Sequence, residues 1–524
     1  MLKRDISTVN ILVASAGGMI GSGWLFSPYI TAQIAGSNAL ICWIIVAICM
    51  LFIALPLCEL GTMFPISGGM AIYPTLTHGQ AVGFLYAWST WLAYVVITPV
   101  EIQAILQYAS HFFPLLTDNE HQGTSMMLSS LGYVVAIGIM IVIVALNTYG
   151  VKLLAEVNKY LSLIKFIIPI IAIVSLLHQS SFLNNIHISL SSRKDWVDVL
   201  SAMSAGGVVF AFAGFQNGLM LAGEVKNPQR DIPIGILGAV LVGFILYFML
   251  EYSFLSAIPQ KYLNHGWAAL HYPGDSGPLV GLSLLLGLGL IATLLMIDAG
   301  FSPLGTTLVY TASTARIIYG MALNQQLPKV FLKLNRHKIP YMSLYLNLGV
   351  GILSFLPFPG WQKLVSFLSS VSILSYGVGP ICLLAMRRLQ PTMARPFNLM
   401  LSGLIAHIAF YLCNLMLYWC GFEILWKLNV ALLMGFLFHG FYKKFSFFTE
   451  RRALYWFISY MLTLLLFSYV GSFAGIQLIA FPYDMIVLLP VSMLFLHWSQ
   501  RVLNKNIHLK QLSQVKEMRV SHSS

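Results

Sequence analysis

Three ionisable residues lie deep inside strongly apolar stretches of this sequence: Glu101, Lys165 and Asp298. A charge within hydrocarbon costs several kcal/mol unless it is paired or neutralised, so such residues are candidates for binding protons or charged cargo. Residues 17–23 add a backbone candidate, because four of these seven positions are glycine. Glycine destabilises a helix by about 1 kcal/mol relative to alanine, and an opened turn leaves N–H and C=O groups that need partners.

The composition identifies the elements that hold these groups. Hydrophobic residues make up 58% of the 524 residues and charged residues only 9%, and the mean hydropathy is +0.81. Such a chain is a polytopic membrane protein and not a soluble one. A helix needs roughly 20 apolar residues to cross about 30 Å of hydrocarbon. The sequence predicts fourteen spans, centred near Ile20, Ala47, Leu92, Ile137, Ile167, Phe212, Leu241, Leu290, Leu348, Leu374, Ala409, Leu433, Leu464 and Leu489.

The distribution of positive charge predicts the orientation of these spans. With the N-terminus in the cytoplasm, nearly all of the 29 Lys and Arg residues fall in cytoplasmic segments. The exceptions are Lys165 within a span and, in outside loops, Arg193, Lys194, Lys261, Lys363 and Lys427. This bias predicts a multi-pass protein of the inner (plasma) membrane with both termini cytoplasmic. The net charge of +12 then reflects topology and contact with the lipid bilayer, and no nucleic-acid partner is implied.

A second glycine-interrupted segment, residues 201–222, opens the second half of the chain. Paired interrupted helices in corresponding positions of two halves point to the binding site of a transporter. Helix packing is the alternative for Gly17 and Gly21, because this spacing also brings two helices close together in membranes. The six cysteines all lie in apolar runs, so neither a disulfide framework nor a metal site is predicted.

Three ordered motifs resemble those of the amino acid, polyamine and organocation permeases. Residues 18–26 (GMIGSGWLF) resemble the family's first-helix signature, and residues 59–69 (ELGTMFPISGG) resemble the motif that closes its second helix. Residues 210–215 and 223–233 resemble the sixth helix and the loop after it. The chain is identified as a member of this superfamily, and its sequence around Glu101 is similar to the branch of bacterial aspartate and proton symporter-like permeases.

The resemblance implies an all-α polytopic membrane fold of the LeuT type, in which two inverted repeats of five spans enclose a central site. It predicts a transporter core over residues 1–390. About four additional C-terminal transmembrane helices then occupy residues 391–500, where no motif is recognised, and residues 501–524 form a basic cytoplasmic tail.

The predicted substrate site binds the two charged ends of an amino acid. Its residues lie at the two breaks: Met19, Gly21, Ser22, Gly23, Phe210, Ala213, Gly214 and Phe215. The N–H groups of residues 21–23, at the positive end of the following helix, suit a carboxylate. The carbonyls of Met19, Phe210 and Ala213 suit an ammonium group. Phe210 and Phe215 are candidates for closing over the ligand, and ordinary core packing is an equal alternative for both.

The resemblance also implies a role for Lys165 in proton coupling. In proton-coupled relatives a lysine on the fifth span takes the place of a sodium ion, here against the carbonyls of Gly17 and Ile20 and the hydroxyl of Ser302. Burial disfavours the charged ammonium, so the lysine would release and regain a proton during transport. The alternative is an interfacial anchor. That alternative requires the helix to begin only at Tyr160, whereas a start near Glu156 places the lysine deep.

The remaining acids have several possible roles. Glu101 and Asp298 are expected to accept a proton, to pair with each other or with Lys165, or to repel an acidic side chain. Glu59 and Glu251 lie near span ends, so they are expected to be hydrated carboxylates at the interface. Gln216 stands where relatives often carry an acid, which favours neutral or acidic amino acids over polyamines or arginine.

These observations predict a secondary active transporter that imports an amino acid with protons by alternating access. An amino acid exchanger is the alternative within transport. An intramembrane enzyme and a substrate sensor are the alternatives from functional classes other than transport. The sequence shows no H-E-x-x-H motif, nucleophile elbow or clustered metal ligands, so no catalytic residue, metal or cofactor is predicted. The predicted partners are the amino acid, protons and the bilayer.

Overall fold

The computed structural model describes residues 6–65, 69–118, 126–149, 151–179, 185–274, 277–358, 360–443 and 451–503, with the backbone alone over 151–163. This part of the chain is built almost wholly from helices. Its one sheet is a short antiparallel ribbon of β1 (Thr117–Asp118) and β2 (Met127–Leu128). The expected all-helical membrane fold is confirmed.

The first apolar segment forms two helices instead of one. Helix α1 (Thr8–Met19) ends at Ile20, whose ψ of 87° leaves the helical range, and α2 (Gly23–Ala35) begins three residues later. The Ser7 side chain caps the start of α1 by accepting the Asn10 N–H at 3.4 Å. The interruption therefore lies within the glycine-rich run that predicted it.

The sixth apolar segment is also interrupted. Helix α9 (Arg193–Ala205) is followed by α10 (Val208–Ala211) and α11 (Asn217–Met220), with the 3₁₀ turn η4 (Ala222–Glu224) after them. Gly214 has a φ of +136°, which side chains rarely adopt, and a Cβ there would overlap the backbone of Gly18 and Met19. The two breaks therefore meet backbone to backbone.

The other apolar segments form the long helices of the molecule. They are α3 (Ala39–Met63), α4 (Gly69–His78), α5 (Gln80–Val95), α6 (Ile97–Ala109), α7 (Ser130–Tyr149), α8 (Val151–His178), α12 (Pro228–Ala257), α13 (Pro278–Leu285), α14 (Gly289–Leu323), α15 (Tyr341–Leu353), α16 (Trp361–Tyr376), α17 (Val378–Leu389), α18 (Ser402–Trp419), α19 (Phe422–Tyr442), α20 (Arg451–Val470) and α21 (Tyr483–Ser499). Every predicted span centre lies in one of them except Ile20 and Phe212, which lie in the two breaks.

Length and apolar composition show that this is a multi-pass membrane protein. Within the described residues, 9 helical segments are long and apolar enough to cross a membrane. Shorter apolar helices accompany them, over Thr8–Met19, Ile164–His178, Tyr341–Leu353 and Tyr483–Ser499. The figure of fourteen spans stays a prediction.

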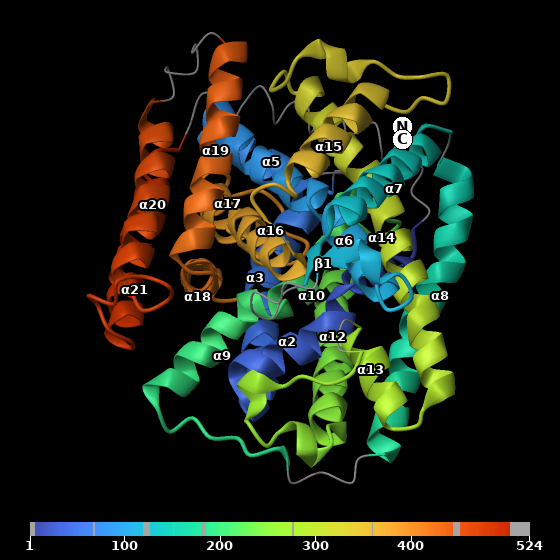
Figure 1. Cartoon of the computed structure of the whole chain (residues 1–524). Coiled ribbons are helices and arrows are strands. Elements are labelled where there is room, and N and C mark those ends of the chain that lie inside the picture. Colours follow the sequence, from blue (N-terminus) through green and yellow to red (C-terminus); the bar gives the residue numbers. More distant parts are fainter. Residues whose placement is uncertain are drawn as a thin grey trace.

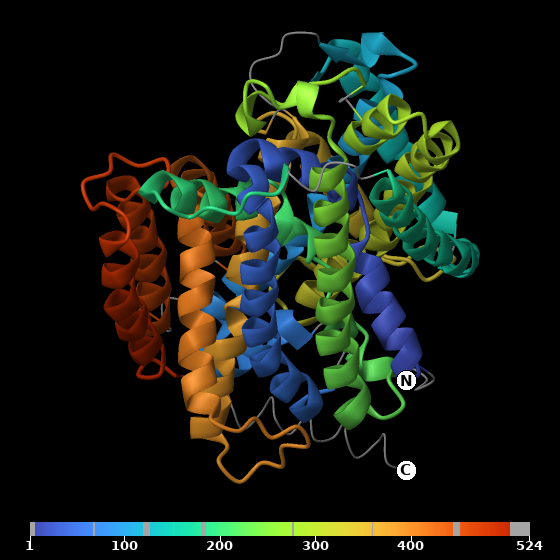
Figure 2. The ribbon, with the colours of Figure 1, turned by 90° about the horizontal axis from the view of Figure 1, so that it is seen from below.

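The longest helices, α12 and α14, pack against the helices that carry the breaks and the buried charges. Helix α12 packs against α1 and α3, and α14 packs against α6 and α8. Helices α18 to α21 form a layer at one side, visible in orange and red in Figure 1, which contacts the rest mainly through α3, α5, α16 and α17. In Figure 2, α1 and α12 begin at the lower edge, and the turns η5 (Gln260–Tyr262) and η6 (Trp267–Ala269) lie at the upper edge.

A buried ion-pair cluster links α3 to α17 and to the segment before α18. Glu59 on α3 is fully buried, and Arg387 donates to both of its oxygens, from Nε at 2.9 Å and from Nη2 at 2.7 Å. Arg395 Nε lies 3.4 Å from Oε1, and the Leu399 N–H donates to Oε2 at 2.9 Å. The expectation of a hydrated Glu59 is wrong, because its partners come from residues more than 300 positions away.

The same expectation fails for Glu251 on α12. This side chain is fully buried, and its Oε2 accepts the indole N–H of Trp43 on α3 at 2.9 Å. Helices α3 and α12 pack closely enough to exclude water from it. A position near the end of an apolar run does not by itself indicate hydration, since neighbouring helices can cover it.

Candidate functional site

The first break holds a carboxylate of the chain itself. Glu101 on α6 is 1% exposed, and its Oε2 accepts the N–H of Ser22 at 2.7 Å. Gly21 lies directly against this carboxylate, because a Cβ at that position would overlap Oε1. Glu101 therefore accepts a hydrogen bond from one of the N–H groups that were predicted to bind the substrate's carboxylate.

Other side chains bond further polar groups of this break. The indole N–H of Trp361 donates to Ser22 Oγ at 3.0 Å, and the Tyr247 hydroxyl donates to the Met19 carbonyl at 2.9 Å. Backbone groups buried in a membrane protein need such partners. The Met19 carbonyl also accepts the Gly21 N–H at 3.1 Å, so both of its lone pairs have a donor.

Polar groups of the second break also have hydrogen-bond partners within the protein. The Gln216 amide oxygen accepts the Gly214 N–H at 2.9 Å and the Tyr376 hydroxyl at 3.2 Å. The Phe210 carbonyl accepts the Ala213 N–H at 2.8 Å. The neutral side chain at residue 216 thus acts as a local acceptor for the break, a role that the sequence did not suggest.

Lys165 lies deep in the molecule. Helix α8 begins at Val151, upstream of Glu156, which places Lys165 roughly 21 Å along the helix axis at a rise of about 1.5 Å per residue. Its side chain is 3% exposed, and Nζ donates to Thr306 Oγ1 at 2.6 Å. The ammonium also interacts electrostatically with the carboxylates of Glu101 and Asp298. A lysine this deeply buried between two acids is not an interfacial anchor.

The expected partners of Lys165 lie close by, but its hydrogen bond goes elsewhere. Ser302 Oγ donates to the Ile20 carbonyl at 3.5 Å, which ties α14 to the first break. Thr306 lies one turn beyond Ser302 on the same face of α14, and it was not among the predicted site residues. Its spacing of four residues from Ser302 was the available signal.

Asp298 continues the same face of α14 in the other direction, one turn before Ser302. The side chain is fully buried, and within the described residues neither carboxylate oxygen has a hydrogen-bond donor. An ionised carboxylate in such a place is costly, so its charge must be balanced or neutralised. Asp298 therefore joins Glu101 and Lys165 in one electrostatic group.

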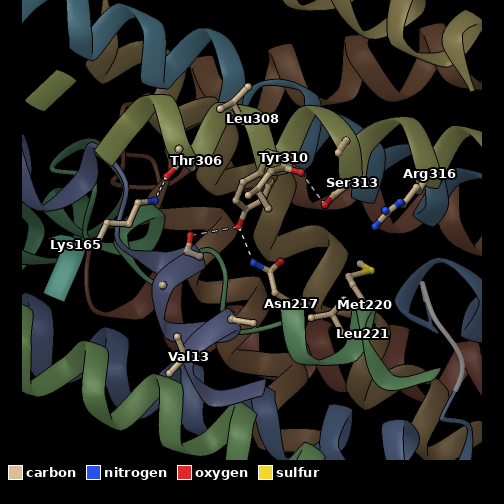
Figure 3. Close-up of a pocket in the computed structure, with 16 residues that line it drawn as sticks. Val13, Lys165, Asn217, Met220, Leu221, Thr306, Leu308, Tyr310, Ser313 and Arg316 are labelled. Atoms are coloured by element: carbon tan, nitrogen blue, oxygen red, sulfur yellow. Dashed lines mark hydrogen bonds between the residues drawn. The ribbon is translucent and has the colours of Figure 1, made fainter. Parts of the chain in front are cut away.

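A cavity of about 370 Å³ lies on the side of the breaks where α1 begins. Its walls come from α1, α8, α11 and α14 (Figure 3). The lining residues are Val13, Ala14, Gly17, Gly18, Lys165, Asn217, Met220, Leu221, Gly305, Thr306, Leu308, Val309, Tyr310, Ala312, Ser313 and Arg316. The cavity thus reaches Gly17 and Lys165, whereas the predicted substrate-binding residues of the two breaks do not line it.

Tyr310 and Asn217 join the two breaks at the wall of the cavity. The Tyr310 hydroxyl donates to the Gly18 carbonyl at 3.4 Å, and Asn217 Nδ2 donates to the Tyr310 hydroxyl at 3.3 Å (Figure 3). The Tyr94 hydroxyl donates to Asn217 Oδ1 at 3.1 Å. The sequence did not identify Tyr310 or Asn217 as site residues, because single polar residues in apolar helices carry no distinguishing pattern.

Aromatic side chains pack on the opposite side of the breaks. The Trp361 ring lies 4.8 Å from Phe26 and 6.0 Å from Phe210 between centroids, and Phe26 lies 5.1 Å from Tyr108. Phe215 instead packs on Tyr376 at 5.0 Å. Phe210 thus belongs to an aromatic cluster with Trp361 and Phe26, and none of these rings lines the cavity.

Comparison with known proteins agrees with this architecture. The family profile described as "Amino acid permease" matches residues 6–438. The chain is 33% identical to the Glutamate/serine transporter AimA of Bacillus subtilis, over 98% of this chain and 96% of that protein. It is 32% identical to the Aspartate-proton symporter of the same organism, over 95% and 96%. The Branched-chain amino acid permease BcaP of B. subtilis is 23% identical, over 84% and 94%.

The two relatives above 30% identity align across almost the whole chain, so they extend beyond the motifs of the first 390 residues. The family and these relatives are transporters and not enzymes. Broken helices in contact, buried charges beside them and a cavity against their backbone are the features that such a protein requires. The chain belongs to the amino acid permease family and is an amino acid transporter.

Proposed function

We propose that this protein imports an amino acid together with protons by alternating access across the plasma membrane, with both termini in the cytoplasm. The observation that carries the proposal is Lys165, a buried ammonium on the cavity wall that is bonded to Thr306 and faces two buried carboxylates. A protonated lysine can hold the first break and α14 together through these groups. Loss of its proton would release them.

The arrangement of open and closed faces supports alternating access. The cavity lies on the side where α1 begins, and the aromatic cluster around Trp361 closes the other side. The proposed core over residues 1–390 contains both breaks, one in each repeat of five spans. In this scheme residues 391–500 support the core, and the tail over 501–524 lies largely outside the described residues.

The site is proposed to bind the substrate through the break residues. The carboxylate binds at residues 21–23, and the ammonium binds at the carbonyls of Met19, Phe210 and Ala213. Among the described residues, the cavity lining contains Lys165 and Arg316 and no acidic side chain. This charge, with the neutral Gln216, favours an acidic or small polar substrate, which agrees with the relatives named for aspartate, glutamate and serine.

The experiment is uptake of labelled aspartate, glutamate and serine into proteoliposomes. An inward proton gradient should drive accumulation by the wild type, and Lys165→Ala should abolish it while partly retaining exchange into preloaded liposomes. Lys427→Ala, which removes a partly buried lysine that pairs with Glu423 outside the site, serves as the matched control and should transport normally. Full proton-driven uptake by Lys165→Ala would refute the coupling role. Uptake only into preloaded liposomes would establish an exchanger, and absence of any flux would leave a sensor.

A further inference from the structure

We propose that Glu101 competes with the substrate's carboxylate for the Ser22 N–H, and that Glu101 must take up a proton before the substrate can bind there. This inference rests on the proposed function, because it assigns the site's first step. Glu101 then couples proton binding to substrate binding through a shared hydrogen-bond donor. Lys165 keeps its separate role in the conformational change.

The space around the Ser22 N–H admits only one carboxylate, either that of Glu101 or that of the substrate. Glu101 Oε2 lies 2.7 Å from the Ser22 nitrogen, and Ser22 is the residue before the first turn of α2 (Gly23–Ala35). A helix N-terminus favours an anion, and a side-chain carboxylate has the same acceptor chemistry as the carboxylate of an amino acid. The Cα of Gly21 lies against the same carboxylate, so two carboxylates do not fit side by side in this space.

The charges around Glu101 favour a one-for-one replacement. Lys165 on α8 faces Glu101, and Asp298 on α14 faces Lys165. Two tyrosine hydroxyls also come near, Tyr247 from α12 and Tyr310 from α14. Adding a substrate carboxylate beside an ionised Glu101 would add a further negative charge to this buried region, which is unfavourable. A neutral Glu101 offsets the added charge and lets the substrate carboxylate face Lys165 in its place.

Protonation also weakens Glu101 as the occupant of the amide. A neutral carboxyl group is a weaker acceptor than a carboxylate, because charge-assisted hydrogen bonds are about twice as strong as neutral ones. The carboxylate of an amino acid stays ionised at mildly acidic pH. The Ser22 N–H therefore exchanges a neutral acceptor for a charged one when substrate binds. By linkage, the proton and the substrate increase each other's affinity by the same factor.

The test measures equilibrium binding of L-aspartate and L-serine to the purified full-length protein in detergent, without any gradient. The dissociation constant of the wild type should rise with pH, by up to about tenfold per pH unit once Glu101 is ionised, as one linked proton requires. Calorimetry in buffers of different ionisation enthalpy should show uptake of about one proton per substrate at the same pH. Glu101→Gln should remove both the pH dependence and the proton uptake, and should retain binding.

The matched control is Glu251→Gln, which changes a buried glutamate outside the site and should keep the wild-type pH profile. A residue that only caps α2 would lower stability when changed but would leave the pH profile of binding intact. Retention of the wild-type profile by Glu101→Gln overturns the proposal, as does loss of binding at all pH values by a folded Glu101→Gln. Absence of proton uptake by the wild type also overturns it, without any variant.

The two proposals fail separately. If wild-type liposomes show no proton-driven uptake while the binding results agree with competition, the symport function is wrong and the competition at Ser22 stands. If proton-driven uptake occurs and Glu101→Gln keeps its pH-dependent affinity, the competition alone is wrong.

Discussion

The Cα of Gly214 lies against the peptide that joins Gly18 to Met19, so at this point the two broken helices meet backbone to backbone. This contact fixes the distance between the breaks and leaves no room for a side chain. The site's polar groups come from both sides of it, with Ser22 and Met19 on one segment and Gln216 and Asn217 on the other.

Replacing Gly214 by alanine should separate the two breaks. The new Cβ would overlap the Gly18 carbonyl carbon and the Met19 nitrogen, and the φ of +136° adds strain, so we expect a loss of about 1–3 kcal/mol in stability. Substrate binding should be lost to a greater extent than stability, because the N–H and C=O groups move apart. Thermal unfolding and substrate-induced stabilisation measure the two effects.

Gly403→Ala is the control for this change, since a Cβ at Gly403 meets no atom within 4 Å. Substitution at this helical position should leave binding unchanged. If Gly214→Ala binds substrate as the wild type does, the direct contact between the breaks is not required for the site.

Replacing Thr306 by valine should weaken proton coupling. Valine has a similar shape but removes the hydroxyl that accepts from Lys165 Nζ, and a hydrogen bond to a charged group contributes about 1.5–3 kcal/mol. We expect proton-driven accumulation to fall by roughly 10- to 100-fold, with substrate exchange less affected. Thr293→Val on the same helix, at an exposed position, should transport normally. Equal loss of accumulation and exchange would contradict a role in coupling.

Replacing Arg387 by alanine should destabilise the fold. It removes two hydrogen bonds from the fully buried Glu59 and leaves Arg395 as its remaining cation, and breaking a buried ion pair costs about 3–5 kcal/mol. The neighbouring Arg388→Ala, which loses one bond from an exposed side chain, should change stability by less than about 1 kcal/mol. Adding Glu59→Gln to Arg387→Ala should restore part of the loss. A double variant as unstable as the sum of the singles would show that the pair does not interact.

Stability should also depend on pH through Asp195, outside the membrane. The N–H and hydroxyl of Ser192 hold the pKa of Asp195 below its usual value, in a capping box at the start of α9. A lowered pKa in the folded state adds stability above the unfolded pKa of about 3.9 and loses it as pH falls through the folded pKa. Asp195→Asn should therefore be less stable than the wild type at neutral pH and equal to it in strong acid. A difference independent of pH would contradict this assignment.

Local patterns of the sequence were sufficient for the class of protein and for the position of both breaks. A membrane-spanning helix can be recognised from its own hydropathy, because it must be apolar over about 30 Å whatever its neighbours are. Glycine likewise weakens a helix at its own position, so the interruptions after Met19 and around Gly214 could be predicted without knowing their surroundings. The resemblance in three motifs then predicted the family.

The partners of these groups could not be predicted, because they depend on how helices distant in the sequence cross. Glu59 was expected in water and lies with Arg387, and Lys165 binds Thr306 beside the serine that was named. The placement of Glu101 on the Ser22 amide is of the same kind, since it joins residues 79 positions apart. Composition and spacing set which segments enter the bilayer and where they bend. Packing between helices set which side chain reaches each exposed backbone group, since that depends on rotation and crossing angle and not on local sequence.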